Sequence, residues 1–141
     1  MVLNFINDGS VTDVQGFEAG ATYAGMKTYA KDKYDLGIVW SNTPCVSAGV
    51  FTTNKVISPS ISVSRDNVLK GHVQAVTVNS GIANAGVGNA GKLDAEEVIQ
   101  LTASKLNIKP VNVAFLSTGI IGVELPMALI RAALQKIEFQ H

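Results

Sequence analysis

Apolar residues in this chain fall into short runs between turn-forming residues in the first half, and recur at helical spacing only later. Leu36–Trp40, Val73–Val78 and Val113–Leu116 have the length and the β-branched content of buried strands. Residues Ile61–Ser64 alternate between apolar and polar, which is the pattern of a half-buried strand. A further apolar run spans Val46–Phe51. Strands are therefore predicted to dominate the first half, and Val73–Val78 and Val113–Leu116 add two strands in the second half.

Two helices are predicted in the second half. Asp94 is a suitable N-cap with Glu97 three residues on, as in a capping box, and Pro110 ends this helix. The other helix begins at Leu125, with Pro126 in its first turn. Strands followed by helices predict an α+β (mixed α/β) class. The apolar positions at helical spacing are Val98, Leu101 and Leu106 in the first helix and Met127, Ile130, Leu134 and Ile137 in the second.

A glycine-rich segment, Asn79–Gly91, follows one predicted strand and shows no periodicity, so it is predicted to be a loop. Within it, Gly86–Lys92 satisfies the dinucleotide pattern G-x-G-x-x-G and nearly satisfies the P-loop pattern. A P-loop has Ser or Thr after its Lys, whereas this chain has Leu93, and seven residues separate Val78 from the first glycine. A nucleotide-binding protein that uses this loop is therefore kept as an alternative function.

Composition narrows the possible partners. The chain has 141 residues, 47% of them hydrophobic, with 11 basic and 11 acidic residues and no block of like charge. This neutral balance argues against nucleic acid and anionic membranes as partners. Only 16% of the residues are charged, which is low for a small soluble monomer and suggests that another chain covers part of the surface. No signal peptide or membrane span is apparent and Cys45 is the only cysteine, so a cytoplasmic location is expected.

Most familiar catalytic arrangements have no support in the sequence. The two histidines are isolated and Cys45 has no nearby partner, so no metal site is predicted. A Ser/His pair would have to use His72, which is interpreted as a surface turn residue, and no G-x-S-x-G motif accompanies it. No bound cofactor is predicted, and the chain offers no evident nucleophile.

The most informative stretch is Val113–Gly122, in which an apolar run ends abruptly in Ser-Thr-Gly. Gly119 lets the backbone turn and approach another molecule closely. Main-chain N–H groups at such a turn, together with the Thr118 hydroxyl, could converge on a developing negative charge. The alternative is an ordinary turn after a strand, in which Thr and Gly serve only the shape of the chain.

Six motifs occur in an order that resembles a known family. The first three are Gly16–Gly20 with Gly25–Lys27, then Asp35–Val39, then Phe51–Asn54 with Pro59. The last three are Asn79–Ala85 (Asn-Ser-Gly-Ile-Ala-Asn-Ala), Ser117–Gly122 (Ser-Thr-Gly-Ile-Ile-Gly) and Leu125–Met127. Together they resemble the N-terminal (α) part of the bifunctional ornithine acetyltransferase (glutamate N-acetyltransferase, ArgJ) family of arginine biosynthesis, from about Gly16 to Ile137.

The resemblance implies a mechanism. Proteins of this family are made as a precursor that cleaves itself before a Thr, which becomes the N-terminal nucleophile of the β chain. That Thr takes the acetyl group from N-acetylornithine and passes it to glutamate, and some members also use acetyl-CoA as co-substrate. The family's Ser-Thr-Gly motif implies that Thr118 and Gly119 form the oxyanion hole. The nucleophile and the substrate-binding residues would belong to the later region.

The resemblance also implies an architecture. Its fold is a layered sandwich of mixed sheets and helices, similar to N-terminal nucleophile hydrolases (DmpA/ArgJ-like). Residues 1–141 would then be a single incomplete domain that joins a β chain, as in an α2β2 heterotetramer. The sequence departs from the family pattern at Ile82 and at Gly86–Val87, where Asn and Cys-Thr are common. A second alternative is a non-catalytic relative of the same fold that binds a small ligand or a partner.

Overall fold

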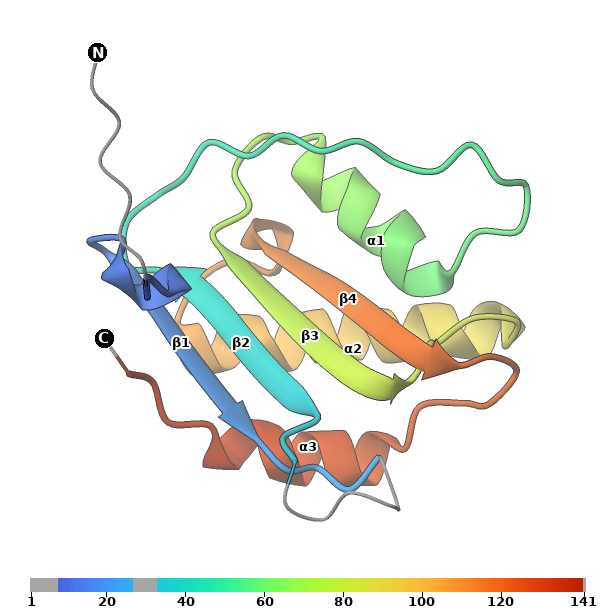
Figure 1. The fold of residues 1–141 in the computed structure, drawn as a ribbon. Coiled ribbons are helices and arrows are strands. Elements are labelled where there is room, and N and C mark those ends of the chain that lie inside the picture. Colours follow the sequence, from blue (N-terminus) through green and yellow to red (C-terminus); the bar gives the residue numbers. More distant parts are fainter. Residues whose placement is uncertain (1–7, 27–32, 141) are drawn as a thin grey trace.

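The computed structural model describes residues 8–26 and 33–140. Their centre is a four-stranded sheet in the order β1-β2-β3-β4 (Figure 1). The first three strands are antiparallel neighbours, whereas β3 and β4 run parallel. Lys27, the last residue of the first glycine motif, lies outside the described residues. The strands are β1 (Phe17–Thr22), β2 (Leu36–Ser41), β3 (Ala75–Ile82) and β4 (Val113–Ile120).

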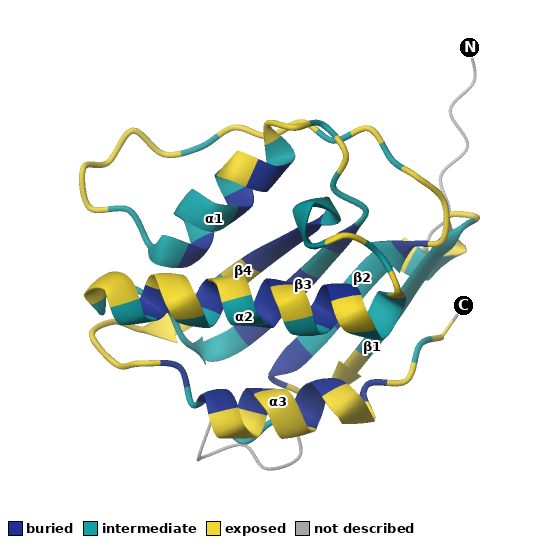
Figure 2. Cartoon of the chain, turned by 180° about the vertical axis from the view of Figure 1, so that it is seen from behind, coloured by how far each residue is buried: buried dark blue, intermediate teal, exposed yellow. Residues whose placement is uncertain are grey.

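Within the described residues, three α-helices accompany the sheet. Two of them, α2 and α3, lie side by side across one face, while α1 lies beside β4 (Figures 1 and 2). Their outward residues are exposed and their inward residues buried, as expected of amphipathic helices that cover a sheet (Figure 2). The predicted α+β class with a mixed sheet is confirmed. The helices are α1 (Pro59–Val68), α2 (Gly88–Leu106) and α3 (Met127–Lys136), with short 3₁₀ turns at Val11–Asp13 and Pro110–Asn112.

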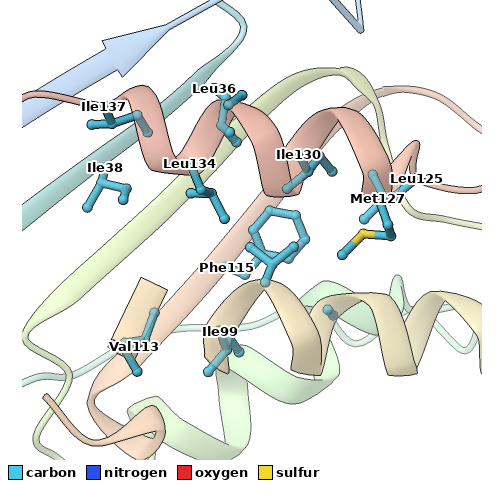
Figure 3. Packing of buried hydrophobic residues seen from close by; sticks show 14 of the residues in the cluster. Leu36, Ile38, Ile99, Val113, Phe115, Leu125, Met127, Ile130, Leu134 and Ile137 are labelled. Atoms are coloured by element: carbon cyan, nitrogen blue, oxygen red, sulfur yellow. The ribbon is translucent and has the colours of Figure 1, made fainter. Parts of the chain in front are cut away.

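The hydrophobic core lies between the sheet and the helices α2 and α3. Phe115 of β4 is fully buried at its centre, with Ile99 of α2 below it and Ile130 of α3 above it in Figure 3. Leu36 and Ile38 of β2 extend the same layer toward the C-terminal half of α3 (Figure 3). The opposite face of the sheet carries no helix of the described residues in either view (Figures 1 and 2).

Helix α1 occupies a segment for which a strand is predicted, so the prediction for Ile61–Ser64 is wrong. The residues that α1 buries are polar: Ser60, Ser64 and Asn67, at helical spacing. The Ser64 hydroxyl accepts a hydrogen bond from the Phe115 N–H and donates one to its carbonyl, both at 2.8 Å. Asn67 donates to the carbonyl of Val113 at 2.8 Å. These side chains form hydrogen bonds with main-chain groups at the free edge of β4. The face of α1 that packs on the sheet is therefore polar, and the sequence shows no apolar periodicity that would predict this helix.

The glycine-rich segment is also more regular than predicted. β3 continues through Asn79 to Ile82, and α2 begins at Gly88, six residues before Asp94. Asp94 is therefore a residue of the second helical turn, and the predicted N-cap is wrong. Glycine has a poor helix propensity, which hides this helix start from a sequence argument.

Three smaller boundaries differ. β4 continues through the Ser-Thr-Gly motif to Ile120, so that motif is the end of a strand and not a turn after one. The last helix begins at Met127, with Pro126 as its N-cap, two residues later than predicted. The apolar run Val46–Phe51 forms no strand, and Val50 is 99% exposed.

Candidate functional site

The Ser-Thr-Gly motif lies where two parallel strands end together. β3 and β4 are in register to their last residues, so Ser80 is opposite Thr118 and Gly81 is opposite Gly119. Carboxyl ends of parallel strands are where open sheets commonly place binding sites. In Figure 1 this end of the pair lies next to the first turn of α2. The candidate site is built at this end.

Gly119 has a conformation that only glycine adopts readily. Its φ is +131°, and that of the opposite residue, Gly81, is +130°. A Cβ added at Gly119 would overlap the carbonyl carbon and oxygen of Gly81. The Phe115 N–H points to Ser64 at the free edge of β4, so strand alternation directs the N–H of Gly119 to that edge as well. Gly119 is an exposed residue, so its main-chain N–H is a candidate donor at a position where no side chain fits.

Thr118 lies on the face of the sheet that carries no helix. On the same face, Val78 is 37% exposed and Leu116 45% exposed, and they precede Ser80 and Thr118 in their strands. The Thr118 hydroxyl donates to the main-chain carbonyl of Asn79 at 3.2 Å. This is a long hydrogen bond, and the hydroxyl can rotate away from it toward another acceptor. Thr118 and Gly119 are therefore adjacent, accessible donors.

The buried side of the same strand ends carries a polar cluster. Asn79 is fully buried, and its Nδ2 donates to the Ile82 carbonyl at 2.9 Å. Ser117 donates to the same carbonyl at 2.7 Å. The Oδ1 of Asn79 is buried and has no hydrogen-bond partner among the described residues. No role for Asn79 or Ser117 is predicted from the sequence, because neither residue type nor spacing shows that both side chains converge on one carbonyl.

A second buried asparagine joins the beginnings of two helices. Asn84, with φ of +46°, donates to Ser60 of α1 at 2.7 Å and to the carbonyl of Gly91 in α2 at 2.8 Å. Ser58, the N-cap of α1, donates to the carbonyl of Asn84 at 2.9 Å. The N-termini of both helices are thereby fixed beside the ends of β3 and β4.

The structure changes the context of the glycine loop. Because β3 continues to Ile82, only three residues separate the strand from Gly86, and Gly88 opens α2. The order strand, glycine loop, helix is thus closer to a phosphate-binding arrangement than the sequence suggests. Lys92, however, pairs with Glu96 on the helix surface at 3.8 Å, and the following Leu93 supplies no hydroxyl for a metal ion. The loop therefore has the strand, glycine loop and helix order of a phosphate-binding site, but it lacks the side chains that such a site uses.

His72 and Cys45 lie far from this site. His72 is an exposed residue of the loop before β3, at the opposite end of that strand from Ser80. Cys45 follows β2 in an irregular segment, and its thiol donates to the carbonyl of Thr43. A pairing of His72 with a Ser or Thr of the Ser-Thr-Gly motif is therefore geometrically impossible. The described residues include no group of three or more His, Cys, Asp and Glu side chains that could hold a metal ion.

Charged groups gather on the outer side of α2. Glu97 accepts two hydrogen bonds from Arg131 of α3, at 2.5 and 2.8 Å, and these bonds lower the pKa of the Glu97 carboxyl. Burial raises the pKa of Asp94, Glu124 and Glu97 raise it further, and Arg131 lowers it. This cluster joins α2 to α3 and does not include Thr118 or Gly119.

A hollow with a volume of about 690 Å³ lies along β1 and β2 and extends to Val78 of β3. Tyr34, Lys136 and Gln140 also line it. Its lining does not include Thr118 or Gly119, so the candidate site is an open surface in this chain and not part of this hollow.

Comparison with known proteins identifies the family. The ArgJ family matches residues 18–140. The arginine biosynthesis bifunctional protein ArgJ of Dehalococcoides mccartyi is 44% identical over 129 residues, and that of Staphylococcus epidermidis is 42% identical over 130 residues. Each alignment covers 92% of this chain but only 32% of the relative. The chain therefore spans about a third of the length of these curated relatives.

Solved structures agree with this fold. The crystal structure of ArgJ from Bacillus halodurans matches with a TM-score of 0.85 and 38% identity, over 91% of this chain and 66% of that one. The ornithine acetyltransferase of Mycobacterium tuberculosis, solved with ornithine, matches with a TM-score of 0.86 and 31% identity, over 94% and 73%. None of the helices in residues 8–26 and 33–140 has the length and hydropathy that a membrane span requires. With its fold and nearly its whole length matched, the chain belongs to the ArgJ family.

Proposed function

We propose that this chain is the α part of an acetyltransferase of arginine biosynthesis and supplies its oxyanion hole. The reaction is the transfer of the acetyl group from N2-acetylornithine to glutamate, through an acetyl-enzyme on the N-terminal Thr of a β chain. The observation that carries the proposal is the presence of Thr118 and Gly119, with their donors accessible, at the end of a strand in a chain of this family.

The chemistry requires donors at that position. When a nucleophile attacks the acetyl carbonyl, negative charge develops on its oxygen in a tetrahedral intermediate. The Gly119 N–H is fixed by the backbone, and the Thr118 hydroxyl reaches the oxygen after leaving the Asn79 carbonyl. Donors already in place stabilise this charge more than they stabilise the ground state, which raises kcat.

The nucleophile is proposed to come from the rest of the protein. His72 and Cys45 lie at the far end of the sheet, so this chain's described residues bring no activated nucleophile to Thr118. The part of this chain that aligns covers 32% of the length of the curated relatives, but 66% and 73% of the two solved chains. The solved chains are therefore much shorter than the curated relatives. Division of a longer precursor into an α and a β chain accounts for this difference.

The sheet face that carries Thr118 supports a β-chain partner. It bears no helix of the described residues and exposes Val78, Leu116 and Ile120, the last to 63% (Figures 1 and 2). An apolar sheet face is normally buried against a second layer, as in the sandwich architecture. A β chain on this face would cover the apolar residues and bring its nucleophile to Thr118. The enzyme is expected to be an α2β2 heterotetramer in the cytoplasm, without a bound cofactor, and acetyl-CoA is a possible second acetyl donor.

The relatives' names support the proposed substrates. The relatives are arginine biosynthesis proteins, and the solved Mycobacterium enzyme is an ornithine acetyltransferase with ornithine bound. Acetyl transfer between an ornithine and a second amino acid is thus the reaction class to test first.

The test uses the full-length protein and mass spectrometry. After incubation with N-acetylornithine alone, one acetyl group should be found on the N-terminal Thr of the second chain, and glutamate should remove it. Residues 1–141 alone should show no turnover. Acetylation of this chain, or turnover by residues 1–141 without a second chain, would overturn the assignment of roles.

A further inference from the structure

We propose that Asn79 and Ser117 are positioning residues of the oxyanion hole, a role that rests on the function proposed above. Both side chains donate to the Ile82 carbonyl, Asn79 at 2.9 Å and Ser117 at 2.7 Å. This pair of hydrogen bonds is called the Ile82 clamp. Neither side chain faces the open surface, so neither would touch the substrate.

The clamp acts one residue beyond the peptide that supports Gly119. The Cα of Gly119 packs so closely on the Gly81–Ile82 peptide that an added Cβ would overlap the Gly81 carbonyl. The clamp holds the carbonyl of Ile82, which belongs to the next peptide of the chain, and so limits the movement of the Gly81–Ile82 peptide at its Ile82 end. A shift of the peptide would therefore move Gly119, and with it the N–H proposed to bind the oxyanion. Gly81, with φ of +130°, is a point at which such a shift is easy once the clamp is gone.

Asn79 also reaches Thr118 through its own main chain. The Asn79 carbonyl accepts the hydrogen bond of the Thr118 hydroxyl at 3.2 Å. Asn79 thus acts on both proposed donors. Its side chain supports the position of Gly119 through the Ile82 clamp, and its main-chain carbonyl orients the Thr118 hydroxyl. An oxyanion hole depends on such positioning, because donors must point to the place where the charge develops and not to the ground-state oxygen.

The unsatisfied atom of Asn79 supports a role for this residue beyond stability. The carbonyl of Ile82 and the sulfur of Met26, both acceptors, lie at one end of the amide, so this end is Nδ2. The other end, Oδ1, is buried without a partner among the described residues, and such an atom costs folding free energy. An apolar side chain would avoid this cost at a fully buried position. The asparagine is accounted for by the hydrogen bond that Nδ2 makes.

The same strand offers a matched control. Two residues before Asn79, the Thr77 hydroxyl is hydrogen-bonded to that of Thr102 at 2.7 Å, and both side chains are fully buried. Thr77 lies on the same side of β3 and makes a buried hydrogen bond of the same kind, but this bond does not involve Ile82. Thr77→Val therefore measures what the loss of a buried polar contact in β3 does to the enzyme without loosening the clamp.

The first test compares Ser117→Ala with Ser117→Thr in the full-length, matured enzyme. Ser117→Ala should lower kcat by up to about 10²-fold, the cost of a small misplacement near reacting atoms, while KM stays within a few-fold. Ser117→Thr keeps the hydroxyl and should restore most of the rate. Thr77→Val should lower the melting temperature and leave kcat per folded molecule unchanged.

The second test is a pH profile of the variant Asn79→Asp. When the new carboxyl group is protonated, it donates to the Ile82 carbonyl as the amide Nδ2 does, whereas the ionised carboxylate cannot. The kcat of the variant should thus approach that of the natural protein at low pH and fall as the carboxyl loses its proton, a step that the natural protein lacks. If this variant does not fold, the Ser117 pair decides the question.

The outcomes separate this proposal from the one before it. The clamp is overturned if Ser117→Ala and Asn79→Asp both have the same kcat as the control Thr77→Val while Thr118→Ala is slow. In that case the proposed oxyanion hole still stands. Thr118→Ala with the kcat of the natural protein would overturn both. A slow Ser117→Ala that Ser117→Thr rescues supports the clamp.

Discussion

The two halves of the β3–β4 strand pair are built for different tasks. In the first half, Thr77 and Phe115 are fully buried and the strands pack against α1 and α2. In the second half, from Asn79 and Ser117 onward, most side chains are polar or absent and Gly81 faces Gly119. One continuous ladder therefore joins a rigid, apolar anchor to a polar end with accessible donors, and rigidity in the first half is what makes precise placement in the second half possible.

The largest effect is expected from Gly119→Ala, because the added Cβ would enter the closest backbone contact in the polar half of the strand pair. A Cβ would overlap the Gly81 carbonyl, and the φ of +131° is strained for any other residue. The variant should lose at least about 10²–10³ in kcat, as when an oxyanion donor is removed. It should also lose about 1–3 kcal/mol of stability from overpacking.

The measurement for Gly119→Ala is kcat on matured protein together with thermal unfolding. Gly122→Ala is the matched control, because Gly122 also has a positive φ, of +80°, but a Cβ there meets nothing within 4 Å. Equal losses in the two variants would show that strain alone, and not the contact with Gly81, matters.

Phe115→Ala tests the apolar half. Phe115 is fully buried at the centre of the core, so its truncation should cost about 3–5 kcal/mol of unfolding free energy. The remaining folded enzyme should keep a kcat close to normal, because the donors lie in the other half. Denaturant unfolding and the activity per folded molecule measure the two quantities. A kcat loss that exceeds the loss of folded protein would show that the two halves are not separable.

Thr118→Ala is the converse change. It removes a proposed donor from the open face of the sheet, so kcat should fall by about 10²–10³, or about 2.7–4 kcal/mol, with little change in KM or melting temperature. Thr118→Ser keeps the hydroxyl and should be much milder. Thr102→Ala serves as control, since Thr102 is buried against Thr77 and its loss should lower stability but not kcat. Because the same donors are expected to assist self-cleavage, the rates are measured on matured protein only. Near-normal kcat in Thr118→Ala would remove Thr118 from the site.

The smallest effect is expected outside the strand pair, at Asp94. Its raised pKa means that the folded state holds the proton more tightly than the unfolded state, whose carboxyl titrates near 3.8. The associated stability is fully present below that value and is lost as pH rises through the folded pKa. Asp94→Asn should therefore gain stability relative to the natural protein between acidic and neutral pH, with kcat unchanged. Melting temperatures of both proteins across this pH range test it. If the melting temperature of the natural protein instead rose relative to that of Asp94→Asn with increasing pH, the pKa of Asp94 would not be raised.

The elements that can be predicted are those whose apolar residues face a core directly. The sequence pattern places β2 almost to the residue, and α3 to within two residues, because Leu36, Ile38, Ile130 and Leu134 repeat at the spacing of a strand or a helix. The start of β4 is equally clear. The candidate donors Thr118 and Gly119 also follow from the sequence, through the Ser-Thr-Gly motif.

The elements that cannot be predicted depend on contacts between distant residues. α1 buries Ser64 and Asn67 because the edge of β4, about fifty residues later, needs hydrogen bonds there. α2 begins in glycines because Asn84 holds its first turn against α1. Such requirements belong to the partner segment and leave no periodicity in the segment itself.

By itself, the sequence determined the class, the core strands and the identity of the two candidate donor residues, because apolar spacing and a glycine in a polar motif are local properties. Only the tertiary structure decided that Ser-Thr-Gly is the end of a strand, that Gly119 lies against Gly81, and that Asn79 and Ser117 share the carbonyl of Ile82. The physical reason is that a parallel pair brings together residues almost forty positions apart, and a hydrogen bond between them has no counterpart in local sequence.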